Sequence, residues 1–360
     1  MSEWKEYTIG EICSRFSSGK SIKASQISDE GLYPVYGGNG LRGFTDTFNF
    51  DGECSIIGRQ GAYCGNVRYF KGKAFMTEHA IVAVVNENHN NGYVSNLLSM
   101  MNLAQYQGQS AQPGLSVSTL SKITIKLPDL ATQEECFNVL NLIDQKIQIN
   151  NQINQELEAM AKTLYDYWFV QFDFPDQNGK PYKSSGGKMV YNPELKREIP
   201  EGWGVAKVED IAQTGSGGTP KSTNVSYYSN GEIPWINSGE LEQTVITSTS
   251  NFITEEGLNN SSAKLFPSGT ILVAMYGATA GKVSFLTFEA STNQAICAIM
   301  LTDIRMRYYL KNVIEDLYQY LVKLSTGSAR DNLSQDMIKN IKVVIPSNDI
   351  LDRFYDFSNN

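Results

Sequence analysis

The chain has 360 residues, of which 41% are hydrophobic, and a formal net charge of −8. This length suits two domains of about 130–150 residues, and the composition excludes a disordered or low-complexity protein. The negative charge argues against a simple nucleic-acid coat protein. The five cysteines include no CxxC pair, and no apolar run reaches the ~18 residues of a membrane span, so we expect a reduced, cytoplasmic protein with no membrane partner.

The charge is unevenly distributed along the chain. Residues 1–130 carry equal numbers of basic and acidic side chains, and residues 203–346 are close to neutral. Residues 131–172 are strongly acidic. A near-neutral segment can still present a basic face, or it can bind no polyanion at all, and charge alone favours the second alternative.

The sequence is internally duplicated. Residues 57–67 (IGRQGAYCGNV) align with residues 273–283 (VAMYGATAGKV), and in both stretches two spaced glycines stand between apolar strands. Further landmarks in the same order are Trp4 and Trp203, Leu115 and Leu333, and Pro128 and Pro346. The alternation of β-branched strands, glycine turns and short helices predicts two mixed α/β (α+β) modules, residues 1–130 and 203–346, with an insertion in the second copy among residues 222–265.

Residues 131–172 predict a long helix between the modules. Thr132 and Glu135 have the spacing of a capping box, and apolar and Asn residues then recur three and four positions apart. Such a heptad seam predicts a coiled-coil spacer, the alternative being an amphipathic helix that lies on one domain. The expected helix-pairing residues are Leu140, Ile143, Ile147, Asn150, Asn154, Leu157, Ala161, Leu164 and Trp168.

Two further segments complete the predicted organisation. Residues 173–202 contain several Pro and Gly residues and predict an exposed but ordered connector that crosses between the modules. Residues 347–360 read as the start of a second spacer helix, which is much shorter than the first.

Catalytic motifs are absent from the sequence. The GKS triplet at residues 19–21 lacks the Gly that a phosphate-binding loop needs at position 14, where Ser14 stands. Two histidines and five scattered cysteines give no metal-ligand spacing. Acidic pairs such as Glu134–Glu135 are typical of solvated helix ends. We therefore expect a chain that is not an enzyme by itself and that binds no metal or cofactor.

The full pattern resembles the specificity subunit of type I restriction–modification enzymes. The most specific stretches are residues 164–174 (LYDYWFVQFDF) and 187–203 (GKMVYNPELKREIPEGW), and the resemblance covers essentially the whole chain. It implies that each module is a target recognition domain that reads one half of a split DNA site, while the helix sets the gap. It also implies two methyltransferase subunits that use S-adenosylmethionine, and in some assemblies two restriction subunits that use ATP and Mg.

The candidate DNA-binding residues are polar side chains in and beside the glycine-rich loops. Arg or Lys suits guanine, and Asn or Gln suits adenine, in the major groove; for each residue a structural role in a turn is an equal alternative. In the first module they are Arg59, Gln60, Asn66, Arg68, His79 and Gln112. In the second module they are Tyr276, Lys282, Asn293, Gln294, Arg330 and Asn332. The matched glycines, by contrast, are expected to permit tight turns rather than to touch DNA.

Three alternatives to DNA reading remain open on the sequence. The first is a truncated, specificity-like assembly protein that docks methyltransferase subunits but reads DNA poorly. The second is a repeat protein that binds another polymer, and the third is an enzyme with an unrecognised site. The short segment 347–360 further implies that the seam on the long helix is covered by a partner subunit or by a second copy of the chain.

Overall fold

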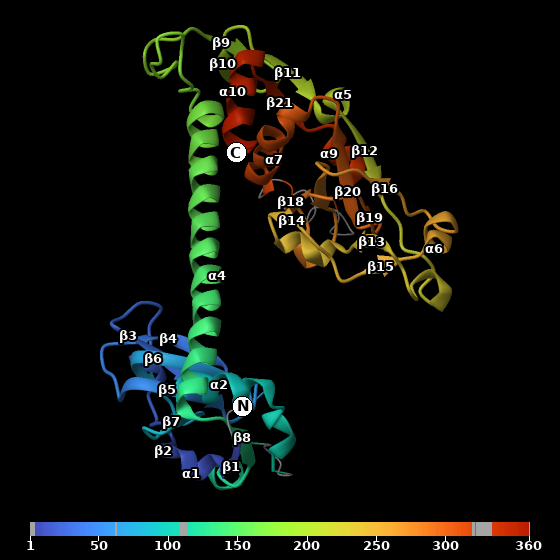
Figure 1. Ribbon diagram of the computed structural model, residues 1–360. Coiled ribbons are helices and arrows are strands. Elements are labelled where there is room, and N and C mark those ends of the chain that lie inside the picture. The colour runs from blue at the N-terminus through green and yellow to red at the C-terminus, as the bar shows by residue number, and fades with distance from the viewer. Residues whose placement is uncertain (1–3, 62, 109–113, 319–320, 322–332, 360) are drawn as a thin grey trace. The chain divides into compact units, whose positions relative to one another are not determined.

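The computed structural model describes residues 4–61, 63–108, 114–318, 321 and 333–359. The chain divides into two compact units, Met1–Ile153 and Asn154–Asn360. Each unit is a mixed α/β domain with its own sheet and core, and the long helix α4 (Leu130–Tyr165) begins in the first unit and ends in the second (Figure 1). The mixed α/β class, the two modules and the long helix predicted from the sequence are confirmed.

The first unit is built on a six-stranded sheet with the order β2-β7-β5-β6-β3-β4. A separate antiparallel pair, β1 with β8, brings the start of the module to its end. Helix α2 packs beside β5 and β6. The elements are β1 (Lys5–Thr8), α1 (Ile9–Ile12), β2 (Cys13–Ser18), η1 (Ala24–Gln26), β3 (Tyr33–Gly37), β4 (Gly40–Thr45), β5 (Phe50–Gly58), β6 (Val67–Met76), β7 (Ala80–Val85), α2 (Asn91–Met100), η2 (Leu103–Tyr106), α3 (Val117–Leu120) and β8 (Thr124–Leu127).

The second unit repeats this frame. Its five-stranded sheet has the order β12-β20-β17-β18-β14, and β11 pairs with β21 as β1 pairs with β8. The elements are β11 (Gly204–Lys207), α5 (Val208–Ile211), β12 (Ala212–Ser216), β17 (Ile271–Ala274), η6 (Gly277–Thr279), β18 (Val283–Leu286), β19 (Ala290–Thr292), β20 (Ile296–Leu301), η7 (Ile304–Met306), α7 (Arg307–Asp316), α9 (Gln335–Lys339), β21 (Lys342–Ile345) and α10 (Asn348–Asn359).

The region where the sequence predicts an insertion holds several small elements, one of which, β13 (Ile233–Ile236), pairs in parallel with β19 as β3 pairs with β6 in the first module. They are η4 (Val225–Tyr227), β13 (Ile233–Ile236), η5 (Ser238–Glu242), β14 (Val245–Ile246), β15 (Phe252–Ile253), α6 (Glu255–Asn259) and β16 (Leu265–Phe266). Strands β13, β15, β16 and β19 form a second, four-stranded sheet.

Each central strand supplies two cores, one on each face of its sheet. Successive side chains of a strand point to opposite faces, so Ile57 of β5 packs with the cluster around α1 and α2, while Ile56 packs with Phe50 and Met76. In the second unit Val273 and Leu272 of β17 divide between two clusters in the same way. These buried faces explain why both modules carry apolar strands on either side of the glycine turns.

Helix α4 starts differently from the capping box that the sequence predicts. Its first turn is capped by Asp129, whose Oδ1 accepts a hydrogen bond from the Thr132 amide at 2.9 Å. Thr132 itself is inside the helix, which begins at Leu130, so the capping-box prediction for Thr132 and Glu135 is wrong. The physical reason is that Asp129 offers a charged acceptor to the Thr132 amide, so the helix starts one turn earlier than a cap at Thr132 would place it.

An aromatic core joins the end of α4 to the rest of the second unit. The helix widens into a π-helical turn, Asp166–Val170, in which Trp168 and Phe169 are buried. The Phe169 ring lies 4.6 Å from that of Tyr309 on α7 and 4.9 Å from that of Phe354 on α10. Phe172, at the end of the spacer segment, and Phe174 of the connector are buried rather than exposed, and the connector then folds into the hairpin β9 (Met189–Asn192) and β10 (Arg197–Pro200).

Candidate nucleic-acid interface

The glycine-rich loops of the two modules share one backbone frame. The Leu115 amide donates to the Arg59 carbonyl at 2.9 Å, and the matched Leu333 amide donates to the Met275 carbonyl at 2.8 Å. At the loop tips Gly61 and Gly65 have φ of 83° and 87°, and the matched Gly277 and Gly281 have φ of 77° and 85°. Positive φ strains other residues, so these glycines form turns and set where the polar side chains stand.

Three of the six first-module candidates are already engaged within the fold. Arg59 Nε donates to the Leu115 carbonyl at 3.3 Å, and its Nη1 donates to Ser18 Oγ at 3.4 Å. Gln60 Oε1 lies 3.2 Å from His79 Nδ1, and His79 Nε2 faces Glu78 Oε1 at 3.6 Å. These contacts fix the loop, which gives the three side chains a positioning role whether or not they reach a base.

Asn66 and Arg68 are placed differently. Both side chains are exposed and make no hydrogen bond or ion pair with any residue that the structure describes. They line a recess of about 500 Å³ with the turn between β3 and β4, where Asn39 also stands. Asn39 was not predicted from the sequence, although its position after two glycines is a usable signal. Gln112 lies outside the described residues.

Three of the four second-module candidates that the structure describes make hydrogen bonds within their own module. Tyr276 donates its hydroxyl to the Gln294 carbonyl at 2.8 Å, and Thr219 Oγ1 donates to Gln294 Oε1. Asn293 Oδ1 accepts from the Ala295 amide at 3.1 Å. Lys282 is exposed, with its ammonium 5.6 Å from the centre of the Tyr318 ring. Arg330 and Asn332 lie outside the described residues.

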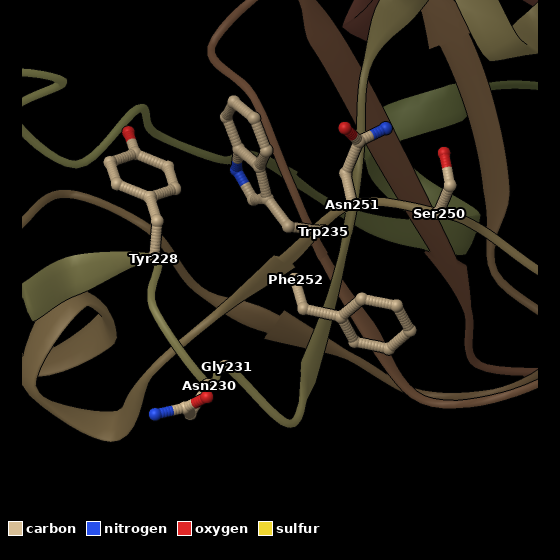
Figure 2. Close-up of a pocket in the computed structure, with 7 residues that line it drawn as sticks. All are labelled: Tyr228, Asn230, Gly231, Trp235, Ser250, Asn251 and Phe252. Atoms are coloured by element: carbon tan, nitrogen blue, oxygen red, sulfur yellow. The ribbon is translucent and has the colours of Figure 1, made fainter. Parts of the chain in front are cut away.

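The insertion of the second module contains an aromatic recess that the sequence did not reveal. Tyr228, Trp235 and Phe252 line a cavity of about 450 Å³ (Figure 2). The Tyr228 hydroxyl donates to the Pro220 carbonyl at 2.5 Å, and Trp235 Nε1 donates to the Gly218 carbonyl at 3.0 Å. The polar atoms of both side chains are engaged, but Asn230, Ser250 and Asn251 also line the recess, so it offers ring faces together with polar side chains.

Helix α4 is the second candidate interface. Of the predicted pairing residues, Leu140, Ile143, Ile147 and Leu157 are about half exposed, and Asn150 and Asn154 are also exposed. Ala161 and Leu164 are half-buried, and Trp168 is buried in the aromatic core, 6.1 Å from Phe354 of α10. The structure therefore covers only the last part of the predicted seam.

A second apolar stripe runs beside the seam. Val139, Leu142, Ile149, Ile153 and Met160 are all exposed. At 3.6 residues per turn these positions extend the apolar surface from one flank of the seam, with Leu142 and Ile149 farthest from it. The heptad pattern missed them because it counts two positions in seven. The exposed apolar arc is thus wider than a two-stranded coiled coil needs.

Three kinds of site are not found in the part of the chain that the structure describes. No group of three or more His, Cys, Asp or Glu residues there could hold a metal ion. No helix among the same residues is long and apolar enough to cross a membrane. The five cysteines form no disulfide, and only Cys136, on α4, is exposed.

The comparisons with known proteins fit this architecture. A family model described as "Type I restriction modification DNA specificity domain" matches residues 1–159 and again residues 200–359. The chain belongs to this family. The two matches reproduce the duplication, one in each half of the chain.

Two curated relatives carry the same family name. The type I restriction enzyme EcoprrI specificity subunit of Escherichia coli is 40% identical over 164 residues, which are 44% of this chain and 41% of the relative. The MjaIX specificity subunit of Methanocaldococcus jannaschii is 28% identical over 258 residues, 70% of this chain and 57% of the relative. The chain thus matches less than two thirds of the length of either relative.

One solved structure shares the fold. The type I restriction–modification S subunit from M. genitalium superimposes with a TM-score of 0.67 at 15% sequence identity, covering 99% of this chain and 89% of that one. At such identity the likeness concerns the arrangement of the two specificity domains and not the residues that contact a ligand.

Proposed function

We propose that this chain is the DNA-reading subunit of a type I restriction–modification complex. Residues 1–130 and 203–346 act as target recognition domains, and each reads one half of a bipartite target. Residues 131–172 form the spacer helix, 173–202 the connector, and 347–360 the start of a second spacer helix. The observation that carries this proposal is the duplicated loop frame, with Leu115 and Leu333 in matched hydrogen bonds, inside two specificity-domain matches.

The spacer helix has the length that a split target requires. Its 36 residues rise roughly 54 Å at about 1.5 Å per residue. Half-sites one turn of B-DNA apart are separated by about 34–36 Å. A helix of this length therefore has room to set the gap and still leave an exposed section for partner subunits.

The exposed apolar arc of α4 is the proposed docking surface for two methyltransferase subunits or for a second copy of this chain. S-adenosylmethionine would bind to those methyltransferase subunits, and ATP and Mg to two restriction subunits where these join. This chain contributes specificity in the cytoplasm and makes or breaks no bond. Near-neutral modules suit this division, because partner subunits can supply much of the phosphate-binding surface.

The proposed base-reading residues are the loop side chains named above, with Asn66 and Arg68 the most available in the first module and Lys282 in the second. The names of the relatives favour DNA specificity over binding to another polymer. The aromatic recess of Figure 2 still offers stacking faces, which suit nucleic-acid bases.

The decisive experiment is single-molecule methylome sequencing of a host that expresses this chain with its cognate methyltransferase subunit. We expect methylated adenine within one bipartite motif, and no such methylation when either protein is expressed alone. Absence of a bipartite motif from cells that contain both proteins would overturn the proposal. Turnover of S-adenosylmethionine by this chain alone would overturn its non-catalytic role.

A further inference from the structure

A recess in the first module is formed where three backbone segments converge. It is lined by the end of β5, the turn after β3 and the start of β6, together with Tyr36 and Tyr63. A Cβ on Gly58 would come within 2.4 Å of the Gly38 carbonyl oxygen and 2.5 Å of the Tyr63 carbonyl oxygen. Only glycine allows this approach, so the recess belongs to the folded loop frame and is not a chance gap at the surface.

Arg68 stands at this recess with its donors unused. Its Nη1 and Nη2 lie 3.1 and 3.2 Å from the point where a Cβ on Gly40 would sit. The guanidinium therefore rests against bare backbone, at a glycine with φ of 95°. It forms no hydrogen bond or ion pair with a described residue, so its five N–H donors remain available in one plane.

The other polar side chains of the recess are two amides. Asn39 and Asn66 are exposed, and their side chains have no hydrogen-bond partner among the described residues. Among the described residues, no Asp or Glu lines the recess. The recess thus presents the guanidinium N–H donors of Arg68 beside two amide side chains, each of which can both donate and accept hydrogen bonds.

This chemistry favours a nucleobase edge over a phosphate. A phosphate oxygen only accepts hydrogen bonds, so the two amide oxygens would find no donor there. A base edge presents donors and acceptors together, and guanine presents two acceptors, O6 and N7, at the spacing of a guanidinium fork. Arg68 and the amides therefore match the major-groove edge of guanine and its neighbouring base.

We propose that Arg68 reads one guanine in the half-site of the first module, donating to its O6 and N7, with Asn39 and Asn66 contacting the adjacent base pair. The inference rests on the proposed function, because it assumes that this module docks on duplex DNA. It adds the residue, the base and the recess through which the contact is made.

Arg42 provides a matched control. It is exposed on β4 near the same turn, its side chain packs over Gly37, and it has no described ion-pair or hydrogen-bond partner. It does not line the recess. Arg42→Ala and Arg68→Ala therefore remove the same charge from neighbouring points of one surface, and only Arg68→Ala removes the guanidinium beside the amides.

The test compares methylation by wild type, Arg42→Ala, Arg68→Ala and Arg68→Lys, each in complex with the methyltransferase subunit, on the motif and on its single-base variants. For Arg68→Ala and Arg68→Lys we expect discrimination at one guanine position to fall roughly 10- to 100-fold, because neither keeps the bidentate fork. For Arg42→Ala we expect an unchanged motif. Thermal melting checks the fold of each variant, and Arg68→Lys keeps the charge if Arg68→Ala fails to fold.

Three results would overturn the inference. The first is an unchanged preference at every position in both Arg68 variants. The second is a uniform loss across all sequences equal to that of Arg42→Ala, which indicates a phosphate contact. In both cases a wild-type complex that still methylates a bipartite motif leaves the proposed function intact. The third is a wild-type complex without any bipartite motif, which removes the proposed function and this inference together.

Discussion

Ile147→Asp separates the two roles of helix α4, as a stable element and as a docking surface. Ile147 is 51% exposed, so in the isolated chain the substitution should change the free energy of unfolding by less than about 1 kcal/mol, mostly through helix propensity. In an assembly that covers the seam, the same change places a carboxylate without a partner in an apolar contact. That typically costs roughly 3–5 kcal/mol, which weakens association at least 100-fold.

The assay is co-purification of the coexpressed methyltransferase subunit, with light scattering of the chain alone and urea unfolding of each variant. Gln155→Asp is the control, because it introduces the same charge on an exposed position of the same helix, away from the seam. We expect Ile147→Asp to lose assembly and Gln155→Asp to keep it. Equal assembly of both variants would refute the seam as an interface. A large loss of stability in isolated Ile147→Asp would show instead that Ile147 packs within the chain.

Three smaller predictions test the fold around this surface. Phe354→Ala removes a fully buried ring from the aromatic core and should lower the free energy of unfolding by about 3–5 kcal/mol, measured by urea denaturation. Asp129→Ala should lower Tm at pH 7. The hydrogen bonds from Thr132 hold the pKa of Asp129 below its ordinary 3.8, so this contribution is present above that pH and is lost as the pH falls through the lowered pKa; a Tm difference that persists in stronger acid would contradict the cap. Ellman's reagent should modify one thiol rapidly, that of exposed Cys136, and Cys136→Ser should abolish the fast phase, whereas burial raises the pKa of Cys54 to about 12.

The duplication could be predicted from the sequence because backbone geometry restricts residue choice. Gly61, Gly65 and their counterparts hold positive φ, and Leu115 and Leu333 fill matched buried positions, so both leave a visible pattern. The long helix could also be predicted, from the three- and four-residue spacing of its apolar side chains. The residue that caps this helix was predicted wrongly, because Thr132 and Asp129 both carry a side-chain oxygen that can cap a helix. The local sequence pattern does not show which of the two is used.

The candidate site was less predictable, because the partners of a polar side chain are set by tertiary contacts. Arg59 and Arg68 look alike in the sequence, yet Arg59 is hydrogen-bonded to Leu115 and Ser18 while Arg68 is unpaired among described residues. The aromatic recess depends on Trp235 and Tyr228 meeting segment 218–220, which no periodicity encodes. Sequence therefore locates the loops, and only the fold shows which side chains in them are free.

The two modules share a frame but not the surface that we propose to read DNA. By the alignment of residues 57–67 with 273–283, the position equivalent to Arg68 is Ser284. Ser284 is buried, and its hydroxyl donates to the Leu241 carbonyl at 3.3 Å and the Gln243 carbonyl at 2.6 Å. The insertion thus occupies, in the second module, the place where the first keeps an open recess. A chain that read DNA through two identical surfaces would favour a symmetric target; these surfaces differ in charge, shape and hydrogen-bonding groups, so the two halves of the target should differ in sequence.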